Sequence, residues 1–347
     1  MRWERVCIEA IAVDLPDERV SSAVLESALA PLYHRLHLGM GQLESLSGVR
    51  ERRFWPKGGP KLASHAARAG RAALDEAGVS PEDLGVVVYC GVGRDDLEPA
   101  TACAVADALG VRGRALVFDV SNACLGVLTG MVVVANMIEQ GQIRAGLVVS
   151  AESAREIAED TVERMLGDPR LETWSHCLAS LTGGSGAVGV VMTSTDFSYT
   201  GRRLLGGAAL SAPEHHRIAR WGPKEGPLGR SSWVMDTDAP AVLEHGIALG
   251  RRTWEAFLAE LGWRAGDLER AVCHQVGKGH QEAILRSLGI PADREYATYS
   301  TLGNMGTVAL PATAAFAAAE GFIAPGDRVG FLGIGTGLNC MMLGIQW

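Results

Sequence analysis

The chain of 347 residues repeats its own pattern of apolar strands and helices, and this duplication constrains its fold more than any single motif does. A glycine-bounded turn followed by a β-run occurs at residues 141–149 and again at 321–331, an offset of 180 residues. A second pair of similar segments, with a slightly different offset, has Asp-Leu before a β-run at 83–90 and at 267–274. Two similar halves that pack about a pseudo-twofold axis are therefore expected.

One cysteine stands at a special point of this repeat. Cys124 follows the β-run 115–120 and precedes an apolar helix predicted for 125–139. The same offset carries Cys124 onto Asn304, which opens the equivalent helix of the second half. The strand that ends at Cys90 in the first half ends at His274 in the second. We therefore expect Cys124, His274 and Asn304 to converge near the axis.

The position of Cys124 suggests a nucleophile. Unpaired N–H groups and the positive end of a helix dipole favour a thiolate, which predicts a pKa below the free value of about 8.5. A buried structural cysteine is the alternative, because free cysteine is among the most buried residue types. Position alone leaves both interpretations open.

Composition excludes several classes of protein. A net charge of −8, without clusters of Lys and Arg among aromatic residues, argues against nucleic acid as a partner. The seven cysteines are an odd number without regular spacing, which argues against a disulfide framework or a zinc site. The chain start lacks a signal-peptide pattern, and no run reaches the roughly 18 to 20 apolar residues of a membrane span. We expect a soluble, cytoplasmic protein with reduced thiols.

Apolar periodicity predicts alternating strands and helices. Strands are expected at 6–13, 84–90, 115–120, 145–150, 187–192, 271–274, 328–333 and 338–345, and helices at 21–37, 62–78, 99–109, 124–140, 239–261, 278–288 and 305–320. This order predicts an α/β fold with largely parallel sheets that helices cover on both faces, arranged as a duplicated five-layer αβαβα sandwich. The N-terminal half would span 1–195, with a polar insertion at 153–180. The C-terminal half would span 196–347, beginning with an early strand and loops at 196–238.

Four segments together resemble the thiolase superfamily, and within it the ketoacyl synthase III branch. They are Asp119-Val120-Ser121-Asn122-Ala123-Cys124, His274-Gln275, Gly303-Asn304 and Gly333-Ile334-Gly335-Thr336-Gly337-Leu338-Asn339. The resemblance covers nearly the whole chain. It implies the duplicated thiolase fold and a Cys-His-Asn triad formed by Cys124, His274 and Asn304.

Within that branch the chain looks most like the OleA group, which begins long-chain olefin synthesis. The segment from Arg94 to Thr101 resembles the one that carries a glutamate base in that group, which here is Glu98. The sequence His274-Gln275-Val276-Gly277 also departs from the His-Gln-Ala-Asn usual in ketoacyl synthase III. The resemblance implies that Glu98 reaches the partner subunit's site, so that a homodimer is needed. Without the family context, Glu98 would be a solvated helix cap.

The resemblance also implies a role for each residue. Cys124 would take up the first fatty acyl chain, Glu98 would remove a proton from Cα of the second acyl-CoA, and His274 and Asn304 would hydrogen-bond its thioester oxygen. The backbone N–H groups of Cys124 and Thr336 would form an oxyanion hole. The substrates are CoA thioesters, and no cofactor or metal is expected.

Three further features have weaker interpretations. The loop 333–337 resembles a dinucleotide fingerprint but is followed by a strand, not a helix, so we exclude NAD binding. The adjacent His215 and His216 lack a carboxylate at metal-ligand spacing and are expected at the surface. Glu152 could line a pocket or cap a helix, and the sequence leaves it unassigned.

The main functional hypothesis is the non-decarboxylative Claisen condensation of two long-chain fatty acyl-CoAs to a 2-alkyl-3-keto acid. Enzymes of the olefin pathway would then be downstream partners. One alternative is a decarboxylative 3-oxoacyl-[acyl-carrier-protein] synthase III that uses malonyl-carrier protein. Another is a non-catalytic partner subunit of a heterodimeric synthase. Glu98 separates the first two hypotheses, and the intact triad argues against the third.

Overall fold

The computed structural model describes residues 1–225 and 231–347. Its strands are β1 (Val6–Asp14), β2 (Glu18–Ser21), β3 (Glu51–Phe54), β4 (Val86–Tyr89), β5 (Leu116–Asp119), β6 (Ala145–Glu152), β7 (Gly186–Ser194), β8 (Arg203–Ser211), β9 (Ala219–Glu225), β10 (Ser231–Thr237), β11 (Arg270–Cys273), β12 (Arg328–Gly335) and β13 (Asn339–Gln346). The α-helices are α1 (Ser22–Ala28), α2 (Ala30–Leu36), α3 (Gln42–Ser47), α4 (Leu62–Ala77), α5 (Thr101–Leu109), α6 (Gly126–Glu139), α7 (Arg155–Gly167), α8 (Leu171–Leu178), α9 (Ala239–Leu261), α10 (Lys278–Leu288), α11 (Tyr299–Leu302) and α12 (Ala309–Ala319).

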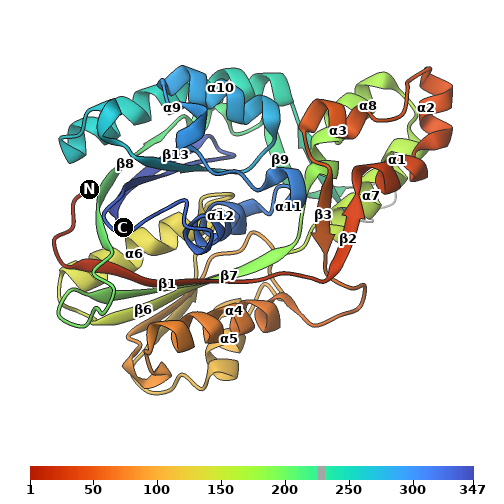
Figure 1. Cartoon of the computed structure of the whole chain (residues 1–347). Coiled ribbons are helices and arrows are strands. Elements are labelled where there is room, and N and C mark those ends of the chain that lie inside the picture. The colour runs from red at the N-terminus through yellow and green to blue at the C-terminus, as the bar shows by residue number, and fades with distance from the viewer. Residues whose placement is uncertain (226–230) are drawn as a thin grey trace.

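Nine of the strands form one sheet in the order β11-β12-β13-β8-β1-β7-β6-β4-β5. The first half of the sequence contributes β1, β7, β6, β4 and β5. The second half contributes β8, β13, β12 and β11. The two groups meet where β1 pairs with β8, at a single pair of residues, Cys7 and Arg203. The sheet folds over at this junction, so that its two parts lie as separate layers (Figure 1).

Helices cover both parts of the sheet and fill the space between them (Figure 1). Helices α4 and α5 pack on the outer face of the first part, and α9 and α10 lie over the second. Helices α6 and α12 lie between the two parts. This arrangement is the five-layer sandwich expected from the sequence.

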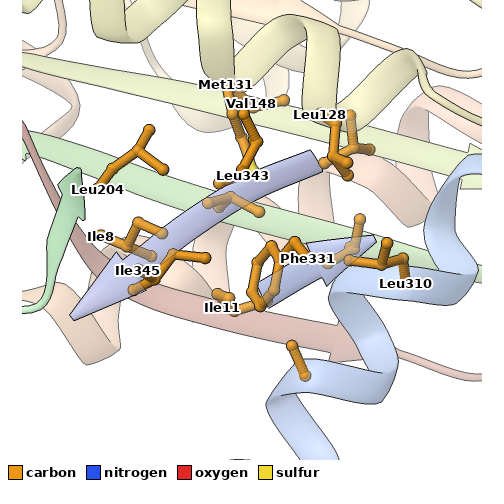
Figure 2. Close-up of a cluster of buried hydrophobic side chains, with 14 of the residues drawn as sticks. Ile8, Ile11, Leu128, Met131, Val148, Leu204, Leu310, Phe331, Leu343 and Ile345 are labelled. Carbon is orange, nitrogen blue, oxygen red and sulfur yellow. The ribbon is translucent and has the colours of Figure 1, made fainter. Parts of the chain in front are cut away.

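Side chains from both sheet layers and from the central helices meet in the largest apolar core (Figure 2). Ile8 and Ile345 come from the two layers, while Leu128 and Leu310 come from α6 and α12, and all four are buried. Burial of aliphatic side chains of this size contributes about 1.5–3 kcal/mol each. This core explains why the sequence of α6 is apolar on nearly every face.

The two central helices also make a polar contact that follows the sequence repeat. The backbone N–H of Val127, near the start of α6, donates to Oγ1 of Thr307, just before α12, over 2.7 Å. The residues are separated by 180 positions, which is the offset found in the sequence. The starts of the equivalent helices therefore lie against each other.

The expectation of largely parallel sheets is wrong. Pairs β4–β5, β4–β6 and β11–β12 are parallel, whereas the five pairs formed by β1, β7, β8 and β13 with their neighbours are antiparallel. An apolar run in the sequence indicates that both faces of a strand are buried, but it does not indicate whether the strand runs parallel or antiparallel to its neighbours. The connections decide direction, as in the short turn between β12 and β13.

The helix predicted for 21–37 is also divided. It forms α1 and α2, which are separated by Leu29. Pro31 causes the break, because proline lacks a backbone N–H and is tolerated in the first turn of a helix but not in its interior. The polar insertion 153–180 contains α7 and α8, which pack with α1 and α2 around a smaller core (Figure 1).

Candidate active site

A cavity of about 1310 Å³ opens between segments of both halves of the chain. Its wall includes Cys124, Asn304 and Thr336, three of the residues singled out in the sequence. Apolar side chains such as Trp55, Leu62, Val92, Ile157 and Met235 line it together with charged residues, among them Lys61, Arg94, Glu152, Asp160 and Arg164. A largely apolar cleft with a few convergent polar groups is typical of a binding site for a small molecule.

Cys124 lies in a sharp turn between β5 and α6. Ala123 before it has φ +46°, in the left-handed region that residues other than glycine rarely adopt. The N–H of Leu125 donates to the carbonyl of Asn122 over 2.9 Å, and the N–H of Gly126 donates to Ala123 over 3.1 Å. This turn presents Cys124 to the cavity while it uses the first amides of the helix internally.

The expected fall in the pKa of Cys124 is wrong. Burial, together with the negative charge of Glu152, raises the pKa of the thiol to about 12. The first amides of α6 do not stabilise a thiolate because they already have acceptors. Those of Leu125, Gly126 and Val127 donate to Asn122, Ala123 and Thr307, respectively. The backbone N–H of Cys124 itself is the amide that favours the thiolate.

Asn304 is held by hydrogen bonds on both of its backbone groups and on its side chain. Its N–H donates to Thr182 and its carbonyl accepts from Gly184, both over 2.9 Å. Its Oδ1 accepts from the N–H of Gly306 over 3.0 Å. Because the amide oxygen is occupied in this way, the NH₂ group is the end of the side chain available to the cavity.

Gly303 allows the backbone before Asn304 to pack closely against Thr182. Its φ is +66°, and a Cβ there would lie 2.4 Å from the carbonyl oxygen of Thr182. A glycine is therefore required next to Asn304 both by backbone conformation and by space.

Thr336 reaches the cavity from the end of β12. A Cβ at the preceding Gly335 would lie 3.4 Å from the backbone nitrogen of Cys124, so the two backbones are in close contact. Gly335 pairs with Asn339 in the turn between β12 and β13, and Asn339 Nδ2 donates to Asn122 Oδ1 over 3.0 Å. The loop 333–337 thus joins two strands, as the sequence indicated.

His274 directly follows β11 and does not line this cavity. Its N–H donates to the carbonyl of Leu332 on β12, three residues before Gly335. Its Nδ1 is buried and has no hydrogen-bond partner among the described residues. Burial, helped by nearby His280, lowers the pKa of His274 to about 4, which makes the imidazole neutral near pH 7.

Glu98 lies in the loop between β4 and α5 and is exposed. Its neighbour Leu97, which is 94% exposed, lines the cavity of its own chain, whereas Glu98 does not. Among the described residues of one chain, Cys124 lines the cavity and Glu98 does not.

Glu152 is the residue that the sequence left unassigned and that the structure places in the cavity wall. Only 9% of it is exposed, and burial raises its pKa to about 7. Its place at the end of β6, directly after a buried run, was the available signal, because polar residues at strand ends often face a site.

The remaining sequence features lie outside the cavity. His215 stacks on His245 with ring centroids 3.8 Å apart, and His216 is exposed. Across residues 1–225 and 231–347, no group of three His, Cys, Asp or Glu side chains is arranged to hold a metal ion. No helix in these ranges is both long and apolar enough to cross a membrane.

Comparison with known protein families supports the same fold. A family model described as 3-oxoacyl-[acyl-carrier-protein] synthase III matches residues 118–168, and a model of the C-terminal part of that protein matches residues 258–347. A crystal structure of OleA from Xanthomonas campestris with bound cerulenin superposes with a TM-score of 0.93 at 34% identity, over 100% of this chain and 98% of the other. The thiolase fold expected from the sequence is confirmed.

Curated relatives match the full length of the chain. An acyl-CoA:acyl-CoA alkyltransferase of Shewanella oneidensis is 50% identical and one of Xanthomonas campestris is 35% identical, with 100% of both chains covered in each case. The chain therefore belongs to the OleA family of acyl-CoA:acyl-CoA alkyltransferases, which are condensing acyltransferases of the 3-oxoacyl synthase III type.

Proposed function

We propose that this protein joins two long-chain fatty acyl-CoAs head to head, without decarboxylation, to form a 2-alkyl-3-keto acid. The observation that carries the proposal is the single cavity in which Cys124, Asn304 and Thr336 meet, in a chain that matches acyl-CoA:acyl-CoA alkyltransferases over its full length. The substrates are CoA thioesters, and side chains and backbone groups of the protein perform the chemistry without a cofactor.

In the first step Cys124 attacks the thioester carbonyl of one acyl-CoA. The bond between that carbonyl and the CoA sulfur breaks, a thioester to Cys124 forms, and the thiol proton leaves with CoA. The backbone N–H groups of Cys124 and Thr336 would stabilise the tetrahedral oxyanion, and their close approach at Gly335 supports this role. A covalent intermediate divides a difficult transfer into two easier steps.

In the second step Glu98 removes a proton from Cα of the second acyl-CoA. Asn304, through its NH₂ group, and neutral His274 would hydrogen-bond the thioester oxygen as an enolate forms. The carbanion attacks the acyl-Cys124 carbonyl and the new carbon–carbon bond forms. The bond from that carbonyl to the cysteine sulfur breaks, and the sulfur takes up the proton that Glu98 removed. Hydrolysis of the remaining CoA thioester gives the keto acid.

A homodimer would supply Glu98 from the partner subunit. Two observations support this part of the proposal. Glu98 is exposed and is not among the residues that line the cavity of its own chain, and β5 is an edge strand on which Leu116 is 55% exposed. Structures of Xanthomonas campestris OleA include variants with a glutamate replaced, and that glutamate precedes the replaced cysteine by as many residues as Glu98 precedes Cys124.

The seven unpaired cysteines suit a reducing compartment, and we place the reaction in the cytoplasm. The keto acid would be passed to downstream enzymes of an olefin pathway.

The test is incubation of the purified protein with myristoyl-CoA alone. We expect CoA release and a product whose mass corresponds to two acyl chains joined, or to the ketone formed from it by loss of CO₂. Turnover that begins only after malonyl-carrier protein is added would instead identify a decarboxylative synthase. A lack of acyl-Cys124 under either condition would identify a non-catalytic subunit. E98A is expected to form the acyl-enzyme normally and to lose condensation.

A further inference from the structure

Among the described residues of the cavity wall, Glu152 is the buried ionisable group for which the proposed reaction has no use. It lies at the end of β6, and its oxygens accept hydrogen bonds from the N–H groups of Val92 over 2.8 Å and Gly93 over 3.3 Å. Both donors belong to the loop 90–100, which carries Glu98. The Glu152 side chain therefore anchors the start of that loop.

The same carboxylate also contacts the segment that carries Asn304. A Cβ at Gly306 would lie 3.3 Å from Cγ, 3.4 Å from Cδ and 3.5 Å from Oε1 of Glu152. Gly306 donates to Asn304 Oδ1, and the backbone of Thr307 donates to Glu152. The carboxylate of Glu152 thus contacts both residues 92–93, at the start of the loop that carries Glu98, and the turn that orients Asn304.

Glu152 also influences Cys124 electrostatically. Its charge opposes ionisation of the thiol, and it also helps to raise the pKa of the phenol of Tyr89 on β4. Among the described residues, no Arg, Lys or His forms an ion pair with Glu152, so backbone N–H groups are what stabilise its charge. A like charge near a thiol is known to disfavour the thiolate.

We propose that Glu152 is a positioning residue of the condensing site, which holds the Glu98 loop against the Asn304 turn and places a negative charge toward Cys124. This inference rests on the proposed function for the roles of Glu98 and Asn304. The anchoring of residues 92–93 and the charge at Cys124 are independent of it.

The first measurement compares the wild type with E152Q and needs no acyl substrate. Alkylation of Cys124 by iodoacetamide is followed by mass spectrometry of the Cys124 peptide, because six other thiols are present. Removal of the charge is expected to raise the alkylation rate at pH 8.5 by about three- to tenfold and to move the pH profile of the rate toward lower pH. E76Q, which removes an exposed carboxylate on α4 outside the cavity, is expected to match the wild type.

The second measurement concerns the loop. A glutamine offers one acceptor and an NH₂ group in place of two acceptors, so one of the two amides of residues 92–93 loses its partner. Amide hydrogen exchange in residues 91–100 is expected to be faster in E152Q than in the wild type and in E76Q. Condensation from preformed acyl-enzyme is expected to fall about ten- to hundredfold, while acylation persists, because small displacements of catalytic groups cost rates of this order.

E152D separates charge from position. It keeps the negative charge but withdraws the carboxylate by one methylene, so we expect nearly wild-type alkylation of Cys124 and a loss of condensation. Unchanged alkylation in E152Q, or unchanged exchange in residues 91–100, would overturn the proposal. If the wild type itself does not condense acyl-CoAs, the proposed function fails, while alkylation and exchange still decide the role of Glu152.

Discussion

At the scale of single residues, the site depends on which polar groups are already bonded. The first amides of α6 are used within the turn around Cys124, so the thiol does not receive the stabilisation that its position in the sequence suggests. The oxygen of the Asn304 amide is occupied by Gly306, which leaves its NH₂ group as a donor. Local hydrogen bonds therefore select which atoms are available for chemistry.

His274 provides a prediction at this scale. Its pKa is lowered to about 4 by burial, while an unfolded histidine titrates near 6.5. The folded state consequently binds fewer protons than the unfolded state between pH 4 and 6.5, so His274 opposes folding more strongly as pH falls through this range. H274N removes this cost. The free energy of unfolding of the wild type minus that of H274N is therefore expected to fall by about 2–3 kcal/mol between pH 7 and pH 4.5.

The measurement is urea unfolding of both proteins across that pH range. H274Q is a suitable control, since it should give the same pH dependence if the effect belongs to the lost imidazole. A difference in free energy of unfolding that stays constant with pH would contradict the prediction.

At the scale of elements, the starts of α6 and α12 lie against each other and bring the two halves of the site together. The hydrogen bond from Val127 to Thr307 joins these starts inside the core, where Thr307 is fully buried. Asn304 precedes α12 and Cys124 precedes α6, so this contact sets the relative position of the two residues.

Thr307→Val tests this contact. It preserves the shape of the side chain but leaves the buried N–H of Val127 without its acceptor, which is expected to destabilise the protein by about 1–3 kcal/mol. Thr307→Ser keeps the hydroxyl and is expected to retain the acceptor at the cost of one methyl group. Chemical unfolding measures both variants, and an equal loss in the two would mean that the hydroxyl contributes little.

Close packing of α4 on β7 provides a second prediction. A Cβ at Gly189 would lie 2.6 Å from the backbone oxygen of Ala69 and 2.8 Å from Cα of Gly70. Gly189→Ala is therefore expected to force the helix away from the sheet and to cost about 1–3 kcal/mol or more. Gly279→Ala on α10 is the matched control, because nothing lies within 4 Å of its added methyl group. A neutral Gly189→Ala in thermal unfolding would show that α4 can shift freely.

At the scale of the whole molecule, the site is completed across subunits in our proposal. Glu98 is exposed and does not line the cavity of its own chain, whereas Cys124, Asn304 and Thr336 share that cavity. A single subunit would then acylate Cys124 but would not condense two acyl chains.

Mixing of two inactive variants tests this division. E98A lacks the base and C124A lacks the nucleophile, so each homodimer is expected to be inactive in condensation. In a mixed dimer one site contains Cys124 of one subunit and Glu98 of the other, and re-equilibrated equal mixtures are expected to recover about a quarter of wild-type condensation. Product formation by mass spectrometry measures the recovery. If mixtures stay inactive after subunit exchange is demonstrated, Glu98 does not act across the dimer.

The sequence by itself determined the layered α/β architecture, the family and the positions of most elements. Hydrophobic periodicity depends on local burial, and the offset of 180 residues pairs Cys124 with Asn304 without any coordinates. The tertiary structure decided the strand directions, the division of α1 from α2, the raised pKa of Cys124 and the place of Glu152. These properties depend on which groups meet across distant segments, because a charge or a hydrogen bond is defined by its partner in space and not by its neighbours in the chain.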